Sequence, residues 1–190
     1  MIRLAIFSSG SGTNAENIIK YFGDDKDVIV EVILSNNPKA YVHQRAKFLN
    51  IDSLTFSKQD FVEGEKILDI LKEKKIDFII LAGFLLKIPQ NIIDLYPDKI
   101  INIHPALLPK YGGKGMYGER VHRAVVEAQE KESGITIHYI NENYDEGDVI
   151  FQARCSILPT DTYKDVADKV HQLEYEYFPE IIDEVIRKSC

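Results

Sequence analysis

A side-chain amide and an imidazole lie two residues apart in the segment Asn102-Ile103-His104-Pro105. This segment closes an apolar, β-rich run over 100–103, and residues two apart in a strand face the same side. We therefore expect Asn102 and His104 to point into one cleft, with Pro105 ending the strand. An amide N–H can stabilise a developing oxyanion, and an imidazole exchanges protons near neutral pH. The pair suits acyl-type transfer, although an Asn/His pair at a strand end also occurs as ordinary hydrogen-bonded structure.

Three carboxylates, Asp145, Glu146 and Asp148, lie in one short loop that follows a strand-like run over 135–140. A carboxylate in this loop could face His104 and favour the protonated imidazole. The same residue types, together with Gly147, are also ordinary turn formers. The residue pattern alone leaves open which of the three carboxylates points inward.

The loop Ser9-Gly10-Ser11-Gly12-Thr13-Asn14 precedes a helical pattern over 15–21. Its glycines permit a positive φ and close backbone approach, and the N-H groups of a helix N-terminus attract a phosphate. Residues 10–15 also fit the GxGxxA dinucleotide fingerprint, and a turn without any ligand remains an alternative. The second strand ends in Ser35-Asn36-Asn37, which lacks the acidic residue that would bind the ribose of NAD. An anion site is the natural interpretation.

Short β-rich runs alternate with helical periodicity over the first 103 residues. The pattern predicts strands over 3–8, 28–35, 53–56, 78–81 and 100–103, with helices over 15–21, 42–49 and 62–73 between them. Such alternation predicts an α/β fold, a single Rossmann-like open sheet that is mostly parallel with helices on both faces. Two strands over 135–140 and 149–157, joined only by a loop, predict an antiparallel extension. A last helix over 163–187 is expected to be kinked or split by Pro179.

The chain has 190 residues, of which 45% are hydrophobic, so one domain over residues 1–190 is expected. Its formal net charge of -7 disfavours broad nucleic-acid binding. No membrane span or signal peptide is recognisable, which predicts a cytoplasmic protein. Cys155 and Cys190 form no CxxC pair and predict neither a disulfide nor a zinc site, with Cys155 packed in the core. The remaining histidines show no metal-ligand spacing and are expected to be structural or surface residues, with no metal bound: His43, His122, His138 and His171.

Taken in order, these loops resemble those of the phosphoribosylglycinamide formyltransferase family, a folate-dependent family, and the resemblance extends over essentially the whole chain. Ser9 to Asn14 is similar to the substrate-phosphate loop of the family, and Leu81-Ala82-Gly83-Phe84-Leu85-Leu86-Lys87-Ile88 to its folate segment. The stretch from Asn102 to Tyr111 resembles the family signature, and Tyr144 to Ile150 resembles its Asp loop. A glycine-rich segment, Gly112 to Gly118, is longer than in many relatives.

The resemblance implies that a formyl group passes from 10-formyltetrahydrofolate, a cosubstrate, to the amine of 5-phosphoribosylglycinamide in purine biosynthesis. A monomer or homodimer is expected, with no metal, no nucleic acid and no membrane as partner. The implied catalytic set is Asn102, His104 and Asp145. The residues implied to bind the ribonucleotide are Ser11, Gly12, Thr13, Asn14 and Glu174. Those implied to bind the folate are Leu85, Leu86, Lys87, Ile88 and Asn102.

Two kinds of alternative stay open. Formyltetrahydrofolate hydrolase and methionyl-tRNA formyltransferase share this chemistry, but each resembles this core with an added domain for which 190 residues leave no room. An oxidoreductase or a nucleotide sensor built on the loop over 10–15 would belong to another class, since a fold does not by itself define a function. The missing acidic residue after the second strand argues against it.

Overall fold

The structure is a computed structural model that describes residues 1–189; Cys190, for which the sequence predicted no disulfide, lies outside the described residues. The chain divides into two compact units, Met1–Ile101 (unit 1) and Asn102 onwards (unit 2). The single domain over residues 1–190 stays a prediction.

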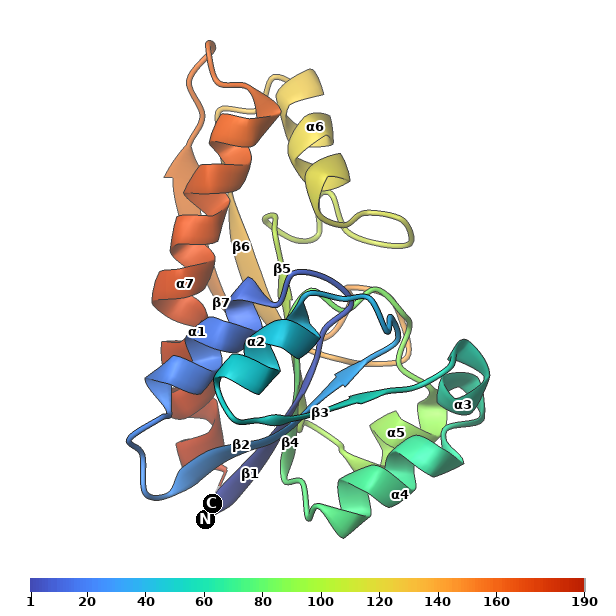
Figure 1. Ribbon diagram of the computed structural model, residues 1–190. Helices are drawn as coiled ribbons and strands as arrows, with labels where there is room; N and C mark the ends of the chain where they lie inside the picture. Colours follow the sequence, from blue (N-terminus) through green and yellow to red (C-terminus); the bar gives the residue numbers. More distant parts are fainter. Residues whose placement is uncertain (190) are drawn as a thin grey trace. The chain divides into compact units, whose positions relative to one another are not determined.

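Seven strands make up the sheet (Figure 1). They are β1 (Ile2–Phe7), β2 (Val28–Ser35), β3 (Asp52–Thr55), β4 (Phe78–Leu81), β5 (Ile100–His104), β6 (Glu132–Tyr139) and β7 (Val149–Ser156). Their hydrogen-bonded order is β3-β2-β1-β4-β5-β6-β7. The pairs β1/β2, β1/β4 and β2/β3 are parallel, whereas β6/β7 is antiparallel. The predicted α/β class, mostly parallel with an antiparallel extension, is confirmed.

Unit 1 carries five helices on its parallel strands. They are α1 (Thr13–Tyr21), α2 (Val42–Phe48), α3 (Lys58–Glu63), α4 (Glu65–Glu73) and α5 (Gln90–Leu95). In Figure 1, α1 and α2 lie on one side of these strands and α4 and α5 on the other. Strand β4 is buried at all four residues, as expected for a strand that is covered on both faces.

The region over 62–73, predicted as one helix, contains the end of α3 and the whole of α4. Gly64 separates the two helices with a left-handed φ of 77°. A Cβ atom at this position would lie 2.3 Å from the Asn91 side-chain nitrogen, and that nitrogen donates to the Glu63 carbonyl at 3.1 Å. The prediction of a single helix was therefore wrong, because a close tertiary contact fixes the break. Helix α5 was not predicted at all.

Unit 2 adds helices α6 (Glu119–Glu127) and α7 (Tyr163–Lys188) to the β6/β7 hairpin. Thr162 begins α7 with a capping box, in which its side chain and that of Asp165 each bond the backbone of the other. The expected split at Pro179 is wrong, because α7 is one continuous helix with buried residues on both sides of the proline. A kink at Pro179 stays a prediction. Cys155, expected in the core, is only half-buried, because β7 is an edge strand.

Candidate active site

Strand β5 delivers Asn102 and His104 to the same side of the sheet, as their spacing predicts. The imidazole of His104 is nearly buried, with 4% of its surface exposed, whereas Asn102 is half-buried. The strand ends at His104. The peptide bond between Leu108 and Pro109, a few residues further on, is cis.

The loop between β6 and β7 carries Asp145 in a left-handed conformation, with φ of 55°. Asp and Asn tolerate this region better than other side chains. Gly147 approaches the hairpin so closely that a Cβ atom would lie 1.8 Å from the Tyr139 carbonyl oxygen. The Asn141 amide holds the loop as well, because it donates to the Glu146 carbonyl at 3.1 Å. The loop is thus fixed locally on both sides of Asp145.

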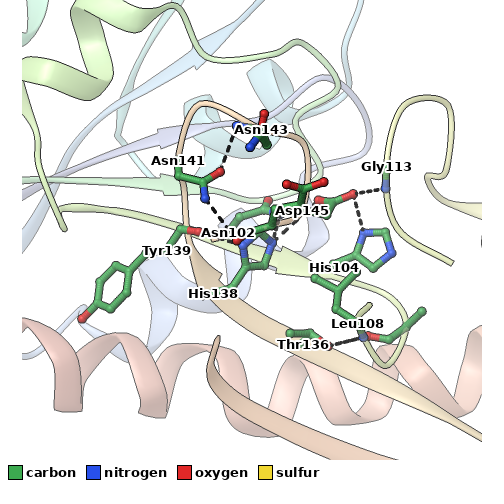
Figure 2. Close-up of polar contacts among 12 residues, drawn as sticks. Asn102, His104, Leu108, Gly113, Thr136, His138, Tyr139, Asn141, Asn143 and Asp145 are labelled. Carbon is green, nitrogen blue, oxygen red and sulfur yellow. Dashed lines mark hydrogen bonds and ion pairs between the residues drawn. The ribbon is translucent and has the colours of Figure 1, made fainter. Parts of the chain in front are cut away.

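The Asp145 carboxylate faces two histidines (Figure 2). One oxygen, Oδ2, accepts a hydrogen bond from the Gly113 N–H at 2.8 Å and lies 3.7 Å from Nδ1 of His104. The other, Oδ1, lies 3.7 Å from Nε2 of His138. Glu146 and Asp148 are exposed. Of the three loop carboxylates, Asp145 is therefore the one that lies beside His104.

The hydrogen-bond pattern fixes the tautomer of His104. Its Nε2 lies 2.8 Å from the Tyr111 carbonyl, and a carbonyl can only accept, so Nε2 carries the proton. Nδ1 then faces Asp145 without a proton when the ring is neutral. Burial lowers the pKa of His104 below its usual value of 6.5, and this outweighs the opposing influence of the Asp145 charge and the Tyr111 carbonyl. The sequence predicted that Asp145 raises this pKa; its influence has that sign, but burial dominates.

His138, expected from its sequence position to be a structural or surface residue, lies in the same cluster. Its ring is fully buried on β6. Nε2 lies 3.0 Å from Nδ2 of Asn102, and Nδ1 lies 2.8 Å from the Tyr139 carbonyl. A signal was present in the sequence: a histidine within the apolar run over 135–139 must find buried polar partners if the strand is covered.

One hydroxyl holds the segment that follows His104. The Thr136 hydroxyl donates to the Ala106 carbonyl at 2.7 Å and accepts from the Leu108 N–H at 3.0 Å. It also accepts from the Gln152 side-chain amide at 2.9 Å, and that amide reaches the Leu108 carbonyl at 3.0 Å. A hydroxyl has one donor and two acceptor positions, so Thr136 is saturated. This network stabilises the backbone from Ala106 to Leu108.

The predicted phosphate loop belongs to unit 1 and opens α1. Gly12 has a left-handed φ of 73°, and a Cβ atom there would lie 2.3 Å from Cγ2 of Val42. Arg45 donates from Nε to the Ser11 carbonyl at 2.9 Å and pairs with Glu16. Thr13 and Asn14 lie in the first turn of α1. The backbone N–H groups of a first turn face the N-terminal end of the helix and have no carbonyl partner within it.

The predicted folate segment follows β4 in the same unit. Phe84 anchors it, because its ring lies 5.3 Å from the rings of both Phe7 and Phe61. Ser9 joins it to the phosphate loop: its hydroxyl accepts from the Leu85 N–H at 3.1 Å and donates to Asn36 at 2.7 Å. The Leu85 N–H therefore already has a partner within unit 1. Along the rest of the segment, Leu86 is half-buried, Lys87 is exposed and Ile88 is buried.

Glu174, the remaining predicted ribonucleotide contact, is a buried carboxylate on α7 of unit 2, with 7% of its surface exposed. Unit 2 thus brings together Asn102, His104 and Asp145, and unit 1 brings together the two predicted binding loops. Within residues 1–189, no three His, Cys, Asp or Glu side chains are grouped so that they could hold a metal ion. None of the helices described is long and apolar enough to cross a membrane.

Comparison with known proteins defines the class of the chain. The family model for formyl transferase matches residues 2–182, so the chain belongs to the formyl transferase family. Within that family it is similar to phosphoribosylglycinamide formyltransferase of Haemophilus influenzae, which is 33% identical over 96% of this chain and 86% of that protein. The chloroplastic phosphoribosylglycinamide formyltransferase of Arabidopsis thaliana is 35% identical over 95% of this chain; the chain spans 64% of its length.

A solved structure shows the same arrangement of strands and helices. The crystal structure of phosphoribosylglycinamide formyltransferase from Bacillus halodurans superposes with a TM-score of 0.89, at 32% identity, over 99% of this chain and 97% of that one. The fold derived above is therefore that of a formyltransferase.

Proposed function

We propose that the protein transfers the formyl group of 10-formyltetrahydrofolate to the primary amine of 5-phosphoribosylglycinamide, a step of purine biosynthesis. The observation that carries this proposal is the cluster in unit 2, where the Asp145 carboxylate lies 3.7 Å from the ring of His104 and Asn102 joins the same network through His138. An amide donor can stabilise the oxyanion of acyl transfer between two nitrogens, and an imidazole beside a carboxylate can carry the proton. Membership of the formyl transferase family supports it.

The reaction begins when the amine nitrogen attacks the formyl carbon. This step places a negative charge on the former carbonyl oxygen and a positive charge on the attacking nitrogen. An N–H of Asn102 stabilises the oxyanion in this proposal. The lowered pKa of His104 keeps its imidazole neutral beforehand, so the ring can take the proton that the attacking nitrogen must lose.

The imidazolium formed in this way lies between two acceptors. Its Nδ1–H faces Asp145 and its Nε2–H bonds the Tyr111 carbonyl. It then donates the proton to N10 of the folate as the bond between N10 and the formyl carbon breaks. The products are tetrahydrofolate and the formylated amine, and His104 returns to its neutral form.

Recognition is assigned to the loops of unit 1. The first turn of α1, with Ser11, Gly12, Thr13 and Asn14, binds the phosphate through backbone N–H groups. The segment Leu85, Leu86, Lys87 and Ile88 binds the pterin with its backbone polar groups and covers it with apolar side chains. Glu174 contacts the ribonucleotide from unit 2, and Asn102 contributes to the folate site.

A single assay tests the activity. Purified protein is mixed with 10-formyltetrahydrofolate, with and without 5-phosphoribosylglycinamide, and free tetrahydrofolate and formate are measured. We expect tetrahydrofolate only when the ribonucleotide is present, and a formylated ribonucleotide in equal amount. Formate released without the acceptor would identify a hydrolase, and no turnover in either mixture would contradict the proposal.

A further inference from the structure

His138 is placed to control which way the Asn102 side chain faces. A carboxamide has two nearly isosteric ends, a donor nitrogen and an acceptor oxygen, and a half-turn about its last torsion exchanges them. If Asn102 stabilises an oxyanion, its nitrogen must have an N–H available for the formyl oxygen. Something in the site has to select that rotamer.

The protonation of His138 follows from its backbone contact. Nδ1 lies 2.8 Å from the carbonyl of the next residue, Tyr139, and a carbonyl accepts only, so Nδ1 carries a proton. In the neutral ring, Nε2 then carries no proton and can only accept a hydrogen bond through its lone pair. A lone pair 3.0 Å from the end of the Asn102 side chain requires the amide nitrogen there and excludes the amide oxygen.

The reverse rotamer would need a charged ring. With the Asn102 oxygen turned toward Nε2, both ring nitrogens would have to be protonated. Two ionisable groups face the ring: Asp145, with Oδ1 at 3.7 Å from Nε2, and His104 on β5. Asp145 and the Tyr139 carbonyl favour the cation, but burial and His104 oppose it, and the pKa of His138 is lowered from 6.5. The ring is fully buried and neutral at neutral pH.

We propose that His138 is a positioning residue that holds the Asn102 carboxamide with its nitrogen inward, in the rotamer that leaves its second N–H for the formyl oxygen. The Tyr139 carbonyl sets the tautomer of His138, and His138 sets the rotamer of Asn102. This inference rests on the proposed role of Asn102. It places two groups, the Tyr139 carbonyl and the His138 ring, behind the oxyanion donor Asn102, so that His138 acts through Asn102 and not on the substrate.

The tautomer is tested without any activity measurement. In ligand-free protein labelled with 15N-histidine, NMR at pH 7.5 should show His138 protonated at Nδ1 and bare at Nε2, and His104 protonated at Nε2. The two rings are thus each other's control. An Nε2–H tautomer or an imidazolium at His138 would overturn the inference, whether or not the protein transfers formyl groups.

Two substitutions separate the two hydrogen bonds of the ring. His138→Gln can place an acceptor near the former Nε2, whereas His138→Asn can replace the Nδ1 donor but is too short to reach Asn102. We expect His138→Asn to lower kcat by about tenfold, the change in rotamer population that one net hydrogen bond can produce. KM for both substrates should stay within about twofold, and His138→Gln should recover most of kcat.

A double-mutant cycle with Asn102→Ala completes the test. Once the side chain being positioned is gone, His138→Asn should have almost no further effect on kcat. Equal losses in His138→Gln and His138→Asn, or additive losses in the cycle, would show that His138 acts only through packing. If wild-type protein proved inactive, the proposed function would fail, while the NMR measurement would still decide the tautomer.

Discussion

Burial keeps three imidazoles of unit 2 uncharged. The pKa values of His104, His122 and His138 all lie below the usual value, with burial as the largest cause in each case. A neutral imidazole can accept a proton from a substrate or a hydrogen bond from an amide, whereas an imidazolium can do neither. Burial thus keeps these imidazoles in the form that can accept a proton or a hydrogen bond.

The clearest pH effect on stability should come from His122 on α6. Burial, with His171 and His104 nearby, lowers its pKa to about 4, and Glu119 opposes this shift only weakly. As the pH falls below 6.5, His122 therefore becomes protonated in the unfolded chain before it does so in the folded protein. The contribution of neutral His122 to the free energy of unfolding is fully present above pH 6.5. It is lost as the pH falls toward 4, and the loss amounts to up to about 3 kcal/mol.

Urea unfolding at pH 7.5 and at pH 4.5 measures this loss. His122→Gln, which cannot titrate in this range, should show a smaller loss between the two pH values than wild type. The matched control is His43→Gln, which makes the same replacement on α2 in unit 1. An identical loss in His122→Gln and wild type would disprove the assignment.

Asn102 carries the largest expected effect on catalysis. Removing one oxyanion donor typically costs roughly 2.7 to 4 kcal/mol of barrier, so Asn102→Ala should lower kcat by about 100-fold to 1,000-fold with little change in KM. Steady-state kinetics with both substrates varied gives the two constants. Turnover close to wild type would remove Asn102 from the mechanism.

At the scale of elements, the loop proposed to bind phosphate, Ser9 to Asn14, has two glycines with opposite surroundings. Gly12 has a positive φ and its missing side chain makes room for Val42, whereas nothing lies within 4 Å of a Cβ atom at Gly10. Gly12→Ala should therefore distort the first turn of α1 and raise KM for the ribonucleotide about tenfold, with kcat changed less. Gly10→Ala is the matched control. If the two variants had the same KM, the first turn of α1 would not be the phosphate site.

The elements with strong local signals were predictable from the sequence. Apolar β-rich runs such as Phe78–Leu81 match their strands, and Ile18, Ile19 and Phe22 face the core as expected. Helices α5 and α6 were missed. Helix α5 has only six residues, whereas α6 carried a usable signal, since Val121 and Val125 lie four residues apart on its buried face. The break at Gly64 and the continuity of α7 through Pro179 both depend on tertiary contacts, which local propensity does not contain.

The part of the candidate site that could be predicted from the sequence consists of reactive side chains that lie within a short motif. Asn102 and His104 could be named in this way, and Asp145 only through the family resemblance; the catalytic role of all three remains a prediction. The Gly113 N–H and the Tyr111 carbonyl could not be, because every residue carries such groups and only the fold decides which of them meet a carboxylate or an imidazole. His138 was expected to be a structural or surface residue, and it is buried; its hydrogen bond with Asn102 could not be predicted, because only the fold brings β6 beside β5.

At the scale of the whole molecule, the single domain over residues 1–190 can be tested by its unfolding. A chain of this size is expected to unfold in one cooperative transition, with equal calorimetric and van't Hoff enthalpies. Differential scanning calorimetry of the full chain measures both enthalpies. Two resolved transitions would show that the units Met1–Ile101 and Asn102 onwards melt separately, and the prediction of one domain would be wrong.

The boundary between the two units falls at Asn102, so every group assigned to bond making and bond breaking is encoded after it, while both loops assigned to recognition are encoded before it. On these assignments, mutations in the first half of the gene can alter the binding of both substrates while the residues assigned to proton transfer stay unchanged; Asn102 and Glu174 are the residues assigned to binding that are encoded in unit 2. Chimeric chains joined at this boundary should exchange acceptor preference more readily than reaction type.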